Sequence, residues 1–171
     1  MVLKVVLFAL LTANAVWFAL GPSPSKAIDA CLWLVLLALF VAETDFGNAL
    51  ATPRSRFLVR AARLVAGIGV VAATIGYVFE DNLLDAVNCV VWIAVVILLE
   101  TELRFPALAA RAGYGFRATA LALYGTLGVL VLLWAVQGMW IDAYDAVLWL
   151  IAFGAIELKV SGRTQVTAAR T

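Results

Sequence analysis

Histidine is absent from this 171-residue sequence, and methionine and cysteine occur only twice each. Without imidazole, the usual protein ligands of haem iron, zinc and catalytic copper are missing. Cys31 and Cys89 form no CxxC pair, so we interpret them as small core residues, with a disulfide or metal role as the alternative. We therefore expect neither a metal nor a cofactor.

Residues for covalent or acid–base catalysis inside a membrane are also scarce. All four serines, Ser23, Ser25, Ser55 and Ser161, fall in expected loops or tails. No glycine loop followed by lysine is present to hold a phosphate. We predict that the protein is not an enzyme and has no nucleic-acid partner; a membrane enzyme that uses interfacial acids on a lipid is a weaker alternative.

Charged residues make up only 13% of the chain, against about 25% in soluble domains, and 65% of residues are hydrophobic. The mean hydropathy of +1.06 agrees with a membrane protein. Spanning a bilayer takes about 20 mostly apolar residues. Six windows meet this requirement: roughly 2–20, 28–46, 59–79, 83–103, 117–138 and 140–159. We predict an all-α polytopic membrane protein with six transmembrane helices.

The same charged residues recur along the chain at nearly constant spacing. An Asp-Ala pair appears at Asp29, Asp85 and Asp142, and a glutamate follows each, at Glu43, Glu100 and Glu157. A basic residue stands 25 positions before each aspartate, at Lys4, Arg60 and Arg117. This periodicity predicts one membrane domain, 1–171, built from three parallel helical-hairpin repeats of about 57 residues, roughly 1–46, 57–103 and 114–160.

The basic residues also predict an orientation. With the amino terminus inside, eleven of the twelve Lys and Arg residues are cytoplasmic and only Lys26 lies outside, as the positive-inside rule requires. Lys4 and Val5–Leu20 could also be interpreted as a secretory signal, but their place in the repeat favours a true span. We predict an integral protein of a bacterial inner membrane with both termini cytoplasmic.

Each repeated glutamate falls at the carboxyl end of a span, where the helix dipole disfavours negative charge. A cationic partner is therefore expected at the same depth. The predicted inner-interface ion pairs, or their equivalents between neighbouring repeats, are Lys4–Glu43, Arg60–Glu100 and Arg117–Glu157. We interpret them as structural clamps, with a transport or gating role as the alternative.

Acids and an amide near the outer ends of the even-numbered spans are the best candidate site. Two of the hairpins place a second oxygen ligand three residues after the aspartate, on the same helix face. Gathered around an axis, these side chains would form a vestibule that attracts cations: Asp29, Asp85, Asn88, Asp142 and Asp145. The alternative is that they are ordinary helix-start acids beside interfacial aromatics.

A row of small residues follows one face of the third span, at spacings of 4, 3, 4 and 3: Ala62, Ala66, Gly69, Ala73 and Gly76. Such a seam lets another helix backbone approach closely. It predicts either packing within the chain or contact with a second copy or another subunit.

Two functions remain open. The first is a non-catalytic subunit or scaffold of a larger membrane assembly, whose partners are membrane lipid and other membrane subunits or further copies of the chain. The second is a small channel or carrier for cations or a neutral solute. Few polar residues lie deep in the spans, which argues for the first.

Overall fold

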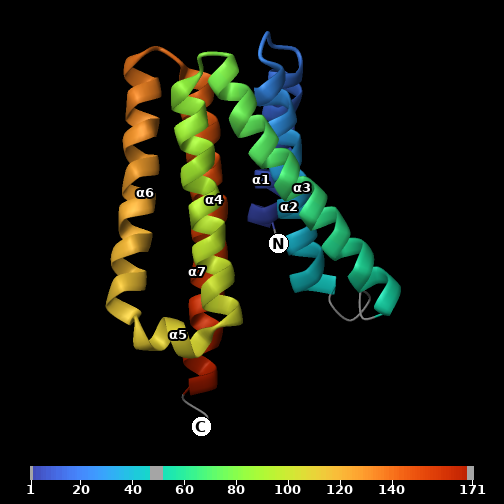
Figure 1. The fold of residues 1–171 in the computed structure, drawn as a ribbon, viewed down its shortest axis with the longest axis vertical. Helices are drawn as coiled ribbons and strands as arrows, with labels where there is room; N and C mark the ends of the chain where they lie inside the picture. Colours follow the sequence, from blue (N-terminus) through green and yellow to red (C-terminus); the bar gives the residue numbers. More distant parts are fainter. Residues whose placement is uncertain (1, 47–51, 169–171) are drawn as a thin grey trace. The chain divides into compact units, whose positions relative to one another are not determined.

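The computed structural model describes residues 2–46 and 52–168; within these ranges, the side chains of 2, 44–46, 103, 106, 109, 110 and 155–168 are left out of the description. In the described residues the chain is entirely helical, with no strand. The helices are α1 Val2–Ala19, α2 Pro24–Phe46, α3 Pro53–Phe79, α4 Leu83–Arg104, α5 Pro106–Arg111, α6 Gly113–Val136 and α7 Trp140–Ala168 (Figure 1). The all-α prediction is confirmed, and each predicted window coincides with a helix.

Four of these helices are long and apolar enough to cross a membrane, counting only described residues: Pro24–Glu43, Pro53–Phe79, Leu83–Glu102 and Gly113–Val136. The apolar stretch of α1, Leu3–Ala19, is shorter. This supports an integral membrane protein, because about 20 apolar residues in helical form match the hydrocarbon thickness of a bilayer.

Small hydroxyl side chains, and a proline in the case of α3, define where helices α2 and α3 begin. Pro53 occupies the first turn of α3, where its missing N–H costs nothing, and the Thr52 side chain accepts a hydrogen bond from the Ser55 amide at 3.2 Å. Ser23 does the same for α2, because its Oγ accepts a hydrogen bond from the Lys26 amide at 3.2 Å. The sequence at the start of α2 and of α3 therefore determines the residue at which each helix begins.

The turns after α3 and α6 have the same backbone geometry. Each contains one residue of positive φ, Asp81 at 56° and Gly138 at 76°. The next amide bonds back five residues, from Asn82 to the Tyr77 carbonyl and from Met139 to the Trp134 carbonyl, both at 2.9 Å. All corresponding residues of the two turns are 57 positions apart. One tight helix-ending motif therefore closes both hairpins.

Burial follows the same spacing. Val70, Ala73 and Tyr77 of α3 are buried, and so are the residues 57 positions later, Leu127, Leu130 and Trp134 of α6. In α4 and α7 the corresponding buried pairs are Ala86 and Ala143, Cys89 and Ala146, Trp92 and Trp149, and Val95 and Ala152. The second and third predicted hairpins thus bury matching faces.

The chain divides into two compact units, residues 12–93 and residues 1–11 together with 94–171. In the 12–93 unit α2 packs closely against α3 (Figure 1). In the other unit the close packing is between α6 and α7. The limits of the units fall inside α1 and α4, and the functional side chains described next belong to the 12–93 unit.

Candidate functional site

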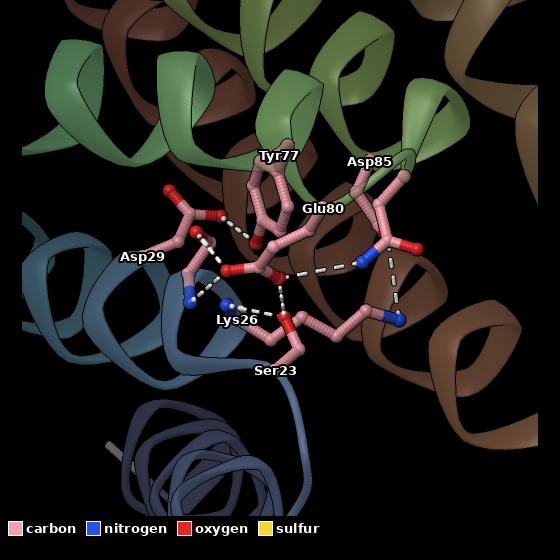
Figure 2. A network of polar contacts seen from close by, with 8 residues as sticks. Ser23, Lys26, Asp29, Tyr77, Glu80 and Asp85 are labelled. Atoms are coloured by element: carbon pink, nitrogen blue, oxygen red, sulfur yellow. Dashed lines mark hydrogen bonds and ion pairs between the residues drawn. The ribbon is translucent and has the colours of Figure 1, made fainter.

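A polar network occupies the end of the 12–93 unit where the α1–α2 and α3–α4 turns lie. Figure 2 shows its main members, Ser23 and Lys26 from the start of α2, Asp29 one turn further, Tyr77 of α3, Glu80 of the turn, and Asp85 of α4. We call this set, together with Ser25, Asn82 and Cys89, the polar network. The residues of the polar network come together because short turns bring the first residues of α2 and α4 beside the last residues of α3.

Glu80 joins the two turns. Its carboxylate accepts hydrogen bonds from the Ser23 hydroxyl at 2.5 Å, the Ser25 hydroxyl at 2.6 Å and the Ser25 amide at 3.1 Å. Donation by the Ser23 hydroxyl, and then by that of Ser25, lowers the pKa of Glu80, because these bonds stabilise the ionised form. Glu80 is therefore an anion that fastens the α1–α2 turn to the end of α3.

Lys26 and Asp85 form the ion pair of the network. Lys26 Nζ lies 3.2 Å from Asp85 Oδ2, and the two side chains are only 15% and 11% exposed. The ammonium also lies 5.8 Å from the centre of the Phe18 ring, within the range of a cation–π contact. Because both charges are largely removed from water, their mutual attraction offsets part of the cost of burying them.

Asp29 extends the network toward the middle of the helices. Its carboxylate accepts hydrogen bonds from the Tyr77 hydroxyl at 3.1 Å and the Cys89 thiol at 3.5 Å. The Cys89 sulfur in turn accepts one from the Thr74 hydroxyl at 2.9 Å. Three helices are thus linked by one carboxylate, with α2 supplying the acceptor and α3 and α4 the donors.

The network includes two of the predicted vestibule residues, Asp29 and Asp85, and gives both of them partners within the 12–93 unit. Asn88 lies one turn after Asp85 on α4, and among the described residues its buried Oδ1 has no hydrogen-bond partner. Asp142 and Asp145 lie at the start of α7, in the other unit. These contacts favour a structural role for Asp29 and Asp85 over cation binding, because a cation would have to compete with Lys26 for the Asp85 carboxylate.

The predicted inner-interface glutamates have neighbouring arginines as partners. Glu43, which was predicted to pair with Lys4 or its equivalent in a neighbouring repeat, pairs with Arg63, one turn after Arg60 on α3. Glu100 pairs with Arg104 at 2.6 Å, one turn along the same helix. The side chain of Glu157 lies outside the described residues. The pairings with Lys4, Arg60 and Arg117 stay predictions.

The small-residue seam of α3 faces α2. A Cβ added to Gly69 would lie 2.6 Å from Cδ1 of Leu32, and one added to Gly76 would overlap the Ser25 hydroxyl. Ala66 and Ala73 are buried on the same face. Of the two predicted uses of the seam, packing within the chain is the one found at these positions. Where α2 also meets α4, Trp33 and Trp92 pack edge to face at 6.5 Å between ring centres.

No pattern in the sequence predicts that one network joins Ser23, Ser25, Tyr77 and Glu80. A signal for part of it was present, because Lys26 is the only basic residue predicted outside among six acids. Such a cation is expected to pair, although its position alone does not say with which acid.

Cys31 is exposed and Cys89 is buried, and neither is in a disulfide. Among the side chains that the structure describes, no three Cys, Asp or Glu are grouped as a metal ion would require.

No protein-family model matches the chain, and neither the curated proteins nor the solved structures contain a match. The function must therefore be argued from the residues themselves.

Proposed function

We propose that the protein is a non-catalytic integral membrane subunit or scaffold of a larger membrane assembly. It consists of six spans in three parallel hairpins, and both termini are cytoplasmic in a bacterial inner membrane. The observation that carries the proposal is the contrast between its polar and apolar surfaces. Polar side chains near the turns satisfy one another inside the 12–93 unit, whereas the span helices carry large exposed aliphatic side chains.

Helix α3 illustrates this contrast most clearly. Its small residues and Tyr77 pack inward, whereas the opposite face exposes large aliphatic side chains at membrane depth: Leu64, Val65, Ile68, Val71 and Ile75. Only 22% of the apolar window of this helix is buried within the chain. In a membrane, lipid or a neighbouring subunit covers such a face, and helix association there depends on close packing.

The repeat is supported by the 57-residue correspondence of the two turns and of the buried faces. Duplication of a hairpin accounts for both correspondences together. The orientation is supported by the distribution of Lys and Arg, eleven of twelve of which fall on one side under this topology.

The alternative is a small channel or carrier for cations or a neutral solute, and one observation favours it. The buried Asn88 Oδ1 has no hydrogen-bond partner in the part of the chain that the structure describes, and an unsatisfied amide oxygen inside a membrane protein is costly. A solute or water path beside α4 would satisfy it. The partners that Asp29 and Asp85 already have weigh against this function.

Native mass spectrometry of the protein, extracted gently from its own membrane, separates the two functions. We expect it to emerge with other polypeptides in a fixed ratio. Emergence alone or as a homo-oligomer, with flux through liposomes that Asp85→Asn or Asp142→Asn abolishes, would contradict the subunit proposal and establish the channel.

A further inference from the structure

A single carboxylate joins the α1–α2 turn to the end of α3. Glu80 Oε2 accepts a hydrogen bond from the Ser23 hydroxyl, and Glu80 Oε1 accepts bonds from the hydroxyl and the amide of Ser25. The Asn82 side-chain amide adds a longer contact of 3.5 Å to Oε2. Figure 2 shows Ser23 and Glu80 facing each other across this junction. The turn therefore stays on α3 through bonds that converge on Glu80.

The Ser25 amide reports directly on this junction. It is the first N–H of α2, because Pro24 has none, and a helix supplies its first amides with no acceptor of its own. Its acceptor is Glu80 Oε1, at 3.1 Å. The next amide, that of Lys26, bonds to the Ser23 hydroxyl. Protection of the Ser25 amide from exchange with solvent therefore depends on the Glu80 carboxylate.

The donors around Glu80 match its ionised form. A carboxylate has only acceptor sites, whereas a protonated carboxyl group carries a hydrogen on one of its oxygens. Hydrogen bonds to an ionised acceptor are also about twice as strong as bonds between neutral groups. Donation by the Ser23 hydroxyl, and then by that of Ser25, accordingly lowers the pKa of Glu80. Protonation of Glu80 would weaken the bonds that hold the turn.

Other contacts hold the start of α2 independently of Glu80. Lys26 Nζ lies 3.2 Å from the Asp85 carboxylate of α4, and the Tyr77 hydroxyl of α3 donates to Asp29 at 3.1 Å. Loss of the Glu80 bonds alone would therefore free the turn and leave α2 beside α3. The titratable groups that the surrounding elements contribute are Lys26 and Asp29 of α2, Tyr77 of α3, Asp81 of the turn, and Asp85 and Cys89 of α4.

We propose that Glu80 is an acid-sensitive latch. As a carboxylate it holds the α1–α2 turn on the end of α3, and when it takes up a proton from solvent it releases the turn while α2 and α3 stay packed. Under the proposed orientation the latch lies on the outer side and responds to the pH outside the cell. The latch itself does not depend on the subunit proposal, because all of its groups belong to the 12–93 unit.

Hydrogen–deuterium exchange of single amides, in the full chain in phosphatidylcholine nanodiscs, tests the latch. The Ser55 amide is the internal reference, because it also lies at a helix start but bonds to the Thr52 hydroxyl, which does not titrate. Release takes up one proton, so exchange of Ser25 relative to Ser55 should rise below pH 4.5 by up to about ten-fold per pH unit. We expect a rise of about ten-fold by about pH 3, with the amide of Val70 in α3 still protected.

Two variants separate the latch from general effects of acid. Glu80→Gln cannot ionise, so the relative exchange of Ser25 should already be high at about pH 7 and change little with pH. Asp81→Asn is the matched control, because it removes the neighbouring charge at a position of positive φ that asparagine tolerates. It should respond to pH as the wild type does.

Three results would overturn the proposal. The first is a relative exchange of Ser25 in the wild type that does not change with pH. The second is a response in Glu80→Gln as large as that of the wild type, which would assign the effect to another acid. The third is loss of Val70 protection together with that of Ser25, because α3 would then unfold with the turn.

Discussion

At the scale of single residues, the Lys26–Asp85 ion pair is the contact most sensitive to substitution. Both side chains are largely buried, so removing one partner takes a compensating charge away from a poorly solvated site. We expect Lys26→Met to lower the free energy of unfolding by about 3 kcal/mol, near the lower limit for buried pairs because some water contact remains. Unfolding in mixed micelles with increasing denaturing detergent measures the change.

Two further variants make this experiment interpretable. Lys26→Met/Asp85→Leu removes both charges and should recover most of the lost stability. Arg104→Gln breaks the exposed Glu100–Arg104 pair, whose side chains are 64% and 35% exposed, and should cost only about 0.3–0.5 kcal/mol. If the double variant were no more stable than Lys26→Met, the broken ion pair would not be the cause of the stability lost in Lys26→Met.

Glu80 makes stability depend on pH. Its pKa is lowered in the folded protein from an ordinary value of 4.5, so its contribution is fully present above that value. The contribution is lost as the pH falls through the lowered folded pKa. We expect the thermal stability of the wild type to fall more steeply than that of Glu80→Gln as the pH drops below 4.5.

The serines provide the control for this pH effect. Ser23→Ala/Ser25→Ala removes the two hydroxyl donors and should flatten the pH profile in the wild-type background. In the Glu80→Gln background the same substitutions should leave the profile unchanged. A steep profile that persists in both backgrounds would assign the pH dependence to other acids.

At the scale of helices, the packing of α2 on α3 depends on two glycines. Gly76→Ala would displace the Ser25 hydroxyl from Glu80, and we expect a loss of about 1–2 kcal/mol. Gly69→Ala should cost about 1 kcal/mol, because the end of the Leu32 side chain can rotate away. Detergent-induced unfolding of each variant gives these values.

Gly67 is the matched control on the same helix. An added Cβ would meet nothing within 4 Å, so Gly67→Ala should keep the stability or raise it by up to about 1 kcal/mol through helix propensity. A loss in Gly67→Ala as large as that in Gly76→Ala would mean that glycine is needed for helix geometry rather than for the α2 contact.

At the scale of the whole molecule, the predicted topology can be tested from outside the cell. In a background with Cys31→Ala and Cys89→Ala, we expect Gln137→Cys to react with a membrane-impermeant maleimide on intact cells. Arg111→Cys should react only after permeabilisation, because it lies in the predicted inner loop. Labelling of Arg111→Cys alone on intact cells would invert the orientation.

The sequence by itself determined that the chain is helical and membrane-embedded, because long apolar runs leave the backbone no other way to satisfy its hydrogen bonds in lipid. It also placed most helix ends within about four residues, but α3 begins six residues before its predicted window and α7 ends nine residues after its own. Pro106 starts the short helix α5 between two predicted windows.

The tertiary structure decided which residues meet. Asp29 and Asp85 were predicted at one interface, but their donors Tyr77 and Lys26 depend on how α2, α3 and α4 are rotated about their axes. The same holds for Glu43, whose partner Arg63 lies three residues after Arg60, the basic residue that recurs in the repeat. A shift of one residue turns a helical side chain by 100°, so spacing along the chain gives depth, whereas only packing gives the partner.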